Sequence, residues 1–402
     1  MRTSAGERIL TVNAGSSSVR IGLFYGQPGQ TVPTLLARGK LDGIGIRPRL
    51  TATLADGTRL LDQDFPVEQV ADMSAAFHLV ELALSFGLRG ERPAVIGHRV
   101  VHGGTQFSDP VRVDREVLEQ LRGFESLAPL HQPYNLAPIQ AILDDSPELV
   151  QVACFDTAFH AGRSEISQMF ALPYPLYEQG IRRYGFHGLS FEYVSLRLAG
   201  VAPEIAAGKV VIAHLGNGSS LCAIEGGRSV EVTTGFSALD GLPMGSRCGA
   251  LDPGVLLHLL ARGEDEDSLQ ELLYQRSGLL GISGVSSDML ILRASQEPRA
   301  RLAIDHYAYR IAQEVGRMAA SIGGLDALVF TAGIGEKDAE LRTQIVKRLT
   351  PLFDLQLDDE ANRRHAERIS TTDSARRLLV IPTDEESMLA RHAWRLYQEG
   401  SA

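Results

Sequence analysis

Two short turns rich in glycine and serine carry the residues best suited to bind phosphate. The first reads NAGSSS at 13–18 and the second reads HLGNGSS at 214–220, and each follows an apolar stretch. Glycine lets the backbone approach a ligand without a Cβ in the way, while amides and serine hydroxyls supply donors for phosphate oxygens. A second apolar stretch follows each turn, so the sequence predicts β-hairpins over 9–24 and 210–224.

The two turns are separated by roughly half of the 402-residue chain, which favours a duplicated fold closing around a nucleotide. An alternative interpretation is that both are ordinary hairpin turns, because glycine, serine and asparagine fill such turns for conformational reasons alone. Neither turn is a Walker A loop, since GxxxxGK[ST] does not occur in the sequence, and no GxGxxG follows a strand.

Other polar residues at strand ends and in glycine-rich turns form a set suited to phosphoryl transfer. The set offers cations, amide donors, imidazoles and a few carboxylates, without a Ser-His-Asp spacing or an HExxH zinc motif. Phosphoryl transfer depends on positioning and charge neutralisation more than on covalent catalysis. The residues are Asn13, Ser16, Ser18, Arg20, Arg99, His131, Asp156, His187, His214, Asn217, Arg247 and Glu385.

Several of these residues also have a purely structural interpretation. A lone arginine such as Arg99 is more often a member of a structural ion pair, and a single histidine such as His187 is more often a satisfied core group. Arg247 differs because it lies between Gly245 and Gly249, in a segment that leaves little except exposed backbone. That context favours a functional role for Arg247.

Strands that end in polar residues alternate with helices along the chain, which predicts an α/β fold. Ligands collect at such strand ends, and the loop 331–336 opens a helix whose free amides can meet a sugar or phosphate. Residues 127–135 are expected to form a loop. The expected strands lie in 94–104, 149–157, 325–330 and 378–386, with a further pair joined by an Asp-Gly turn in 51–60. The expected helices are 74–86, 114–122, 255–262, 301–322 and a closing helix to about Gln398.

Composition restricts the class of protein. A net charge of −10 gives no reason to expect a nucleic-acid partner, which usually requires a basic surface. The three cysteines are widely spaced, which argues against a disulfide framework and a CxxC metal site. Neither a secretory signal nor a membrane-spanning apolar segment is found. We therefore expect a cytoplasmic globular protein of two or three domains, without membrane or nucleic-acid partners.

Seven ordered motifs give the sequence a resemblance to the acetate kinases over essentially its whole length. They are NAGSSS at 13–18, HRVVHGG at 98–104, FDTAFH at 155–160, RYGFHG at 183–188, HLGNGSS at 214–220, MGSR at 244–247 and GIGE at 333–336. The resemblance implies the actin-like ATPase fold, an α/β fold of two duplicated ribonuclease-H-like domains with a nucleotide cleft between them. The expected domains are 1–157, with the C-terminal helix 386–402 packing back on it, and a nucleotide-binding domain at 158–385.

The resemblance also implies a reaction: reversible, Mg²⁺- or Mn²⁺-dependent transfer of the γ-phosphoryl group of ATP to acetate by direct in-line displacement, giving ADP and acetyl phosphate, in a homodimer. The chemistry agrees, because a carboxylic acid with a pKa near ~4.3 is ionised at neutral pH and needs no general base. It needs cancellation of anion–anion repulsion, which arginines and a metal ion provide. Two alternatives stay open: a propionate or butyrate kinase of this family, and a catalytically silent nucleotide-binding regulatory protein.

Roles for individual residues follow from the same resemblance. It places Asn13 and Glu385 at the metal, and Ser16, Ser18 and Arg20 near the phosphoryl group. In this resemblance, Arg99 and Arg247 bind the acyl carboxylate and stabilise the charge that develops on the phosphoryl group. His187 donates a hydrogen bond in the transition state, and Asp156 orients the groups on the acetate side. The residues that it places at the phosphates are His131, His214, Leu215, Gly216, Asn217 and Gly218. Those that it places at the nucleoside are Asp288, Gly333, Ile334 and Gly335. The acyl methyl pocket is expected to be formed by Val101, Leu130, Phe186 and Ala238.

The sequence departs from the family pattern at several positions. Leu290 stands where an arginine is common beside the nucleoside, which bears on nucleotide preference, and Ala238 stands where proline is usual in the acyl pocket. The other departures are Arg20 for lysine, Gln132 for asparagine, Leu189 for threonine, Phe191 for histidine, Ala250 for aspartate and Lys337 for asparagine.

Overall fold

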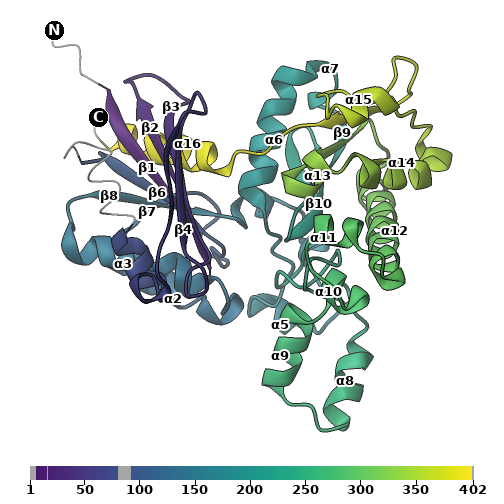
Figure 1. The fold of residues 1–402 in the computed structure, drawn as a ribbon, viewed down its shortest axis with the longest axis horizontal. Coiled ribbons are helices and arrows are strands. Elements are labelled where there is room, and N and C mark those ends of the chain that lie inside the picture. The colour runs from purple at the N-terminus through teal and green to yellow at the C-terminus, as the bar shows by residue number, and fades with distance from the viewer. Residues whose placement is uncertain (1–5, 16, 80–91, 401–402) are drawn as a thin grey trace. The chain divides into compact units, whose positions relative to one another are not determined.

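The computed structural model describes residues 6–15, 17–79 and 92–400. The chain divides into two compact units (Figure 1). Unit 1 comprises Met1–Ala158 and Asp384–Ala402, and unit 2 comprises Phe159–Thr383. Each unit is a β-sheet covered by helices.

Unit 1 contains an eight-stranded sheet in the order β5-β4-β3-β2-β1-β6-β8-β7. Strands β1 to β5 form an antiparallel meander, β6 lies parallel to β1, β8 lies parallel to β6, and β7 is an antiparallel edge. The strands are β1 (Glu7–Ala14), β2 (Ser18–Gly26), β3 (Thr34–Asp42), β4 (Arg49–Leu54), β5 (Arg59–Asp64), β6 (Val95–Val100), β7 (Val111–Arg112) and β8 (Val150–Phe155).

Unit 2 contains a five-stranded sheet in the order β11-β10-β9-β12-β13. Here β9, β10 and β11 are antiparallel, and β12 and β13 run parallel to β9. The core of unit 1, β3-β2-β1-β6-β8, has the same order and directions, so the structure confirms the predicted duplication of an α/β fold. The strands are β9 (Lys209–Leu215), β10 (Ser219–Glu225), β11 (Arg228–Val232), β12 (Ala327–Thr331) and β13 (Arg377–Val380).

Helices pack on these sheets. In unit 1, α16 packs on β6, β1, β8 and β2, and α3 packs on β6 and β1. The helix α16 comes so close to β6 that a Cβ at Gly97 would lie 2.9 Å from the carbonyl oxygen of Leu389, which explains the glycine. The helices of unit 1 are α2 (Arg115–Arg122), α3 (Gln132–Asp145) and α16 (Glu385–Glu399), with 3-10 turns at Val67–Gln69, Glu125–Leu127 and, at the boundary, Ala158–His160.

The longest helix, α12 (Pro298–Ser321), packs on the sheet of unit 2. Its buried residues recur every three or four positions, as in Ile304, Ala308 and Ile311, which is the stripe that a helix needs to cover a sheet. The other helices are α4 (Glu165–Gln168), α5 (Tyr174–Glu178), α6 (Gly188–Val201), α7 (Pro203–Ala206), α8 (Pro253–Ala261), α9 (Glu266–Gln275), α10 (Gly278–Ser283), α11 (Met289–Ala294), α13 (Ala332–Lys337), α14 (Ala339–Phe353) and α15 (Asp359–Arg363).

Most expected elements are confirmed, including both hairpins and the closing helix. The loop predicted for 127–135 is wrong at its end, since α3 begins at Gln132. Its first turn contains Pro133, a position where proline costs no hydrogen bond, so the proline begins the helix and does not mark a loop. The predicted helix 74–86 is helical over 73–79, and its remainder lies outside the described residues. Among the described helices, none is long and apolar enough to span a bilayer.

Candidate active site

An ion pair at the carboxyl ends of two parallel strands forms the centre of the site in unit 1. Arg99 lies near the end of β6, and Asp156 directly follows the neighbouring strand β8. Nε and Nη2 of Arg99 donate to the two Asp156 carboxylate oxygens over 2.9 and 2.6 Å, and Asp156 is buried. The pair has the two-donor geometry that suits an arginine and a carboxylate.

Asn13 and Glu385 complete this group. Nη1 of Arg99 donates to Asn13 Oδ1 over 3.2 Å and lies 3.7 Å from Glu385 Oε2. Burial opposes the charge of Arg99, but the carboxylates of Asp156 and Glu385 outweigh it and raise the pKa of the guanidinium above its ordinary value. Arg99 therefore contacts the other three residues, which were proposed from the sequence at positions far apart in the chain.

The start of α16 fixes Glu385. Asp384 caps the helix by accepting a hydrogen bond from Ser387 N over 3.0 Å, and it also pairs with Arg38. The Glu385 carboxylate and the Asn13 amide oxygen are hard oxygen donors. Mg²⁺ is bound through one or two carboxylates together with substrate phosphates and waters, so these two residues fit that ion. The described residues contain no cluster of three or more His, Cys, Asp or Glu side chains that could form a full protein cage.

The remaining predicted residues of unit 1 surround the same strand ends. Ser18 and Arg20 lie on β2, and Arg20 is in register with Asn13 on β1. Val101 follows β6, His131 precedes the first residue of α3, and Leu130 lies next to it. Ser16 lies outside the described residues.

Two buried amide side chains of α3 tie these segments together. Asn135 accepts a hydrogen bond from Val101 N over 2.9 Å and donates to Ala14 O over 2.6 Å. Gln132 accepts from His102 N over 3.1 Å and donates to His102 O over 3.0 Å. The first turn of α3 thereby positions the acyl-pocket candidate Val101 and the end of β1.

Two histidines beside Arg99 predict a loss of stability in mild acid. Burial lowers the pKa of both His98 and His102 to about 4. Below pH ~6.5 the unfolded chain takes up protons that the folded chain refuses, so the free energy of unfolding falls by ~1.4 kcal/mol per pH unit for each histidine until the pH nears their folded pKa.

Urea unfolding of the full chain at pH 7.5, 6.0 and 5.0 measures this loss. His98→Asn is expected to remove one histidine's share of the slope. Equal slopes in the wild type and in His98→Asn would contradict the assignment.

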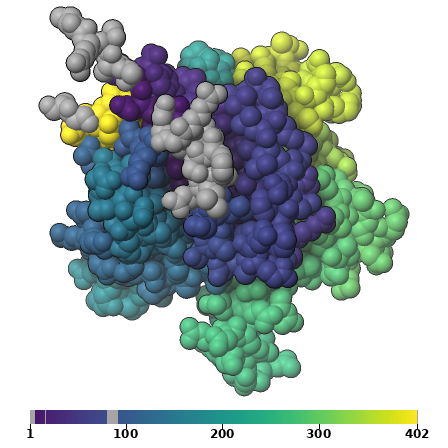
Figure 2. All heavy atoms as spheres, turned by 60° about the vertical axis from the view of Figure 1, so that its left-hand side comes forward, coloured from purple at the N-terminus to yellow at the C-terminus, as the bar shows by residue number. Residues whose placement is uncertain are grey.

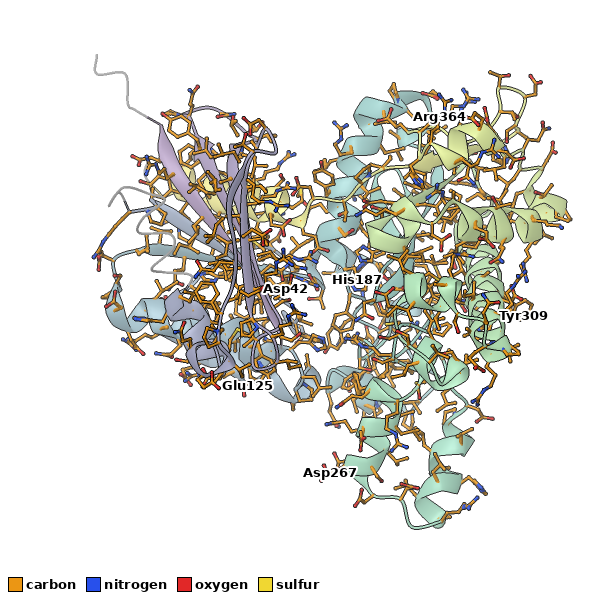
Figure 3. The ribbon with its side chains drawn as sticks, in the orientation of Figure 1. Asp42, Glu125, His187, Asp267, Tyr309 and Arg364 are labelled. Carbon is orange, nitrogen blue, oxygen red and sulfur yellow. The ribbon has the colours of Figure 1, made fainter. Side chains whose placement is uncertain are left out.

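In unit 2, two imidazoles lie face to face. His187 directly precedes α6 (Figure 3 labels it), and its ring stacks on that of His214, with centroids 4.4 Å apart and planes 12° from parallel. Nδ1 of His187 lies 2.8 Å from Ser220 Oγ, and Nδ1 of His214 lies 2.8 Å from Ser190 Oγ. A Cβ at Gly218 would lie 3.1 Å from Nε2 of His187, so this ring faces the second glycine-rich turn.

The second turn also contacts the segment that carries Arg247. Gly245 N donates to Asn217 O over 3.2 Å, and a side chain at Gly245 would collide with Asn217 and approach Ser287, the neighbour of Asp288. Asp288 itself caps α11, since its carboxylate accepts from Leu290 N over 2.7 Å. Loop contacts thus bring the predicted phosphate and nucleoside residues of unit 2 together.

The predicted acyl-pocket residues of unit 2 are linked in a similar way. Arg247 Nη1 donates to Ala238 O over 3.3 Å. Phe186 is buried, and its N–H donates to Thr234 Oγ1 over 3.0 Å, in the loop that leads to Ala238. Phe186, Ala238 and Arg247 therefore belong to one connected part of unit 2.

The loop that contains Gly333, Ile334 and Gly335 forms the short helix α13, which packs on β9. The fully buried side chain of Arg342 fixes its end, donating to the carbonyl oxygens of Gly335 and Glu336 over 2.7 and 2.9 Å. Burial lowers the pKa of Arg342 to about 10. Its charge therefore faces carbonyl groups at the negative end of a helix.

Sequence reasoning missed the residues that orient the predicted ones. Gln132, Asn135, Ser190 and Arg342 all act through backbone groups or through another side chain.

A family model described as the acetokinase family matches residues 8–391. The chain belongs to the acetokinase family. The resemblance found in the sequence motifs is thereby confirmed.

Curated relatives of this acetokinase family chain span nearly its full length. The acetate kinase of Nitrobacter hamburgensis is 49% identical, covering 98% of both chains, and that of Rhizobium meliloti is 47% identical, covering 98% of this chain and all of its own. Among solved structures, the acetate kinase of Porphyromonas gingivalis is 35% identical, with a TM-score of 0.83. A propionate kinase of Francisella tularensis is 33% identical, with a TM-score of 0.88. Each match covers 97% of this chain and 99% of the solved chain. These neighbours confirm the actin-like ATPase fold.

Proposed function

We propose that the chain is an acetate kinase, which transfers the γ-phosphoryl group of ATP to acetate and forms acetyl phosphate and ADP reversibly. The observation that carries this proposal is the convergence of Asn13, Arg99, Asp156 and Glu385 in unit 1 of a chain that belongs to the acetokinase family. Relatives at up to 49% identity are acetate kinases.

The residues present match what this reaction requires. Acetate is already the nucleophile at neutral pH, so the obstacle is repulsion between its carboxylate and the anionic phosphates. Arg99 and Arg247 supply positive charge for the acyl carboxylate and for the phosphoryl oxygens. The stacked His187 and His214 offer ring nitrogens for phosphate oxygens. Such fixed charges and donors stabilise a phosphoryl-transfer transition state without covalent catalysis by the protein.

Acetate kinases need a divalent metal ion with ATP. We propose Mg²⁺, which Mn²⁺ can replace, with Asn13 and Glu385 as the residues that hold it. The ion would neutralise phosphate charge. Asp156 pairs with Arg99 and keeps its guanidinium oriented.

An ATP-dependent acyl hydroxamate assay over a series of short carboxylic acids tests the proposal. Acetate is expected to give hydroxamate. A chain that binds nucleotide but yields none with any acid would favour the silent regulatory protein, and a clear preference for butyrate would overturn the acetate assignment.

The acyl pocket predicts that propionate is used unusually well beside acetate, while butyrate is poor. Ala238 lacks most of the pyrrolidine ring of the proline usual at this position, and an extra methylene gains ~0.8 kcal/mol on burial. Within unit 2, Arg247 Nη1 donates to Ala238 O over 3.3 Å, which ties this loop to the arginine. We expect Ala238→Pro to raise the acetate-to-propionate ratio of kcat/KM. A ratio that the substitution leaves unchanged would refute the pocket argument.

Leu290 predicts loose nucleotide selectivity. Its side chain is 79% exposed at the start of α11, where the family commonly has an arginine beside the nucleoside. Without that arginine, GTP and other triphosphates should be used within about tenfold of ATP, which corresponds to ~1.4 kcal/mol. Comparing kcat/KM for the four common triphosphates measures this, and a preference for ATP above a hundredfold would contradict it.

We also propose that the chain acts as a homodimer in the cytoplasm. The helix α8 has no buried residue although nearly all its side chains are apolar, and Leu257 and Leu260 are exposed. Figure 2 shows α8 and α9 projecting from the surface, and Asp267 near their free end is labelled in Figure 3. An exposed apolar face of this kind is typical of a protein contact. The mass in solution, by light scattering, tests the dimer.

A further inference from the structure

Two short helices of unit 2, α11 and α13, carry residues that the family resemblance places at the nucleoside (Figure 1). Asp288 caps the start of α11, and the loop 333–335 lies in α13. The helix α11 packs on α12, whereas α13 packs on β9 and β12, so different elements support the two helices. Each helix has six residues, and isolated helices shorter than about 12 residues are marginal in water. Tertiary contacts must therefore keep both helices in place.

An ion pair joins the end of α11 to the end of α13. Arg293 lies in the last turn of α11, and Asp338 directly follows α13. Nε and Nη2 of Arg293 each donate to one carboxylate oxygen of Asp338 over 2.9 Å. Two parallel hydrogen bonds of this kind fix the orientation of both partners. The side chains are 21% and 12% exposed, so salt screens this pair less than it screens a pair on the open surface.

Asp338 connects this ion pair to the nucleoside loop. Its backbone N–H donates to the carbonyl oxygen of Ile334 over 2.9 Å. Its carboxylate also accepts a hydrogen bond from Leu341 N over 2.9 Å and thereby caps α14. One residue thus links α11, the loop 333–335 and the start of α14.

The contacts of Arg293 indicate that it positions a helix and does not bind a phosphate itself. Its third guanidinium nitrogen, Nη1, lies 2.9 Å from Oε2 of Glu340, so each of the three nitrogens meets a carboxylate oxygen. A phosphate would have to compete with these carboxylates for the same donors. The effect of Arg293 on a nucleotide must therefore pass through the placement of α11.

We propose that Arg293 and Asp338 are positioning residues for nucleotide binding, because their ion pair holds α11 and α13 at the spacing that fits the nucleoside. The proposal rests on the proposed function and on the nucleoside role that the resemblance gives to Asp288 and the loop 333–335. Neither Arg293 nor Asp338 contacts the nucleotide in this account. Loss of the pair should weaken nucleotide binding and leave the binding of acetate unaffected.

Calorimetry of ADP binding to the full chain, in the presence of Mg²⁺, tests the proposal. Arg293→Ala is expected to weaken binding about tenfold, because small displacements of positioning groups have effects of at least this order. Asp338→Asn keeps an oxygen that can cap α14 but removes the charge, so it should cause a similar loss. The double variant should lose no more than the weaker-binding single variant, since residues that act through one contact are not additive. Unchanged binding in Arg293→Ala, or losses that simply add in the double variant, would overturn the proposal.

Steady-state kinetics separates positioning from a general structural defect. Arg293→Ala should raise the KM for ATP about tenfold, while kcat and the KM for acetate change less than about twofold, which is the pattern of a lost binding contribution. A general defect would impair all three parameters. Equal losses in the KM for ATP, the KM for acetate and kcat would therefore overturn the proposal.

Arg317→Ala is the matched control. Nε of Arg317 lies 2.7 Å from Oε2 of Glu314, and both residues belong to α12, so this ion pair lies within one helix. Its loss should leave ADP binding and the kinetic constants unchanged. ADP binding does not require acetate: if the wild type binds ADP but forms no acetyl phosphate, the proposed function fails while calorimetry still decides the role of the ion pair. A wild type that binds no ADP would overturn both.

Discussion

Arg247→Ala is expected to lower kcat at least ~10²-fold while the protein stays folded. The guanidinium is a charge donor that is used most fully in the transition state, so its removal lowers kcat more than it raises KM. Its contacts in the described structure include hydrogen bonds to the carbonyl oxygen of Ala238 and, weakly, to the sulfur of Met244. The measurement is steady-state kinetics with acetate and ATP, accompanied by circular dichroism.

Arg276→Ala is the control for the charge change. Arg276 lies at the end of α9, and its side chain is largely exposed. It should retain nearly full activity. Turnover near the wild-type value in a folded Arg247→Ala protein would count against the catalytic assignment of this residue.

Arg99→Ala is expected to lose at least ~10²-fold in kcat and also to destabilise the fold. Removing this arginine leaves the buried Asp156 carboxylate without the cation that pairs with it, and breaking a buried ion pair in this way costs about 3–5 kcal/mol. Arg99 stands near the end of a strand, but the ion pair with the buried Asp156 makes it part of the fold. Urea unfolding and kinetics measure the two effects separately.

A second substitution and a control make this result interpretable. Arg99→Lys keeps the charge but not the planar two-donor contact, so it should recover much of the stability and little of the activity. Arg115→Ala breaks an exposed pair with Asp144 and should change the free energy of unfolding by less than ~1 kcal/mol. Full activity in Arg99→Lys would contradict a role that depends on guanidinium geometry.

The sequence predicted the features that follow from a local pattern of residues, namely the two hairpins and the polar residues at strand ends. Hairpins 9–24 and 210–224 were visible from apolar runs around glycine-rich turns. The rule that ligands collect at strand ends made Arg99 and Asp156 candidates, but it did not predict their contact with each other. For Arg99 the structural and the catalytic interpretations were set against each other. The structure shows the ion pair, and the proposed function uses the same pair to orient the guanidinium.

The sequence could not predict which side chains orient the site, because those contacts join distant segments. Asn135 bridges Val101 and Ala14, and Arg342 holds the end of α13 from the next helix. No periodicity in an apolar pattern identifies the partner of a buried amide or guanidinium. The start of α3 was missed for a local reason, since Pro133 resembles a loop signal and also suits a first helical turn.

Phosphorus-31 NMR of the purified chain with ATP, Mg²⁺ and acetate tests the central claim most directly. Acetyl phosphate and ADP should appear together and in equal amounts, and adding ADP and acetyl phosphate to fresh protein should regenerate ATP. The account also predicts that neither reaction proceeds at a comparable rate with Arg247→Ala. Formation of ADP and inorganic phosphate without acetyl phosphate, or no consumption of ATP at all, would contradict it.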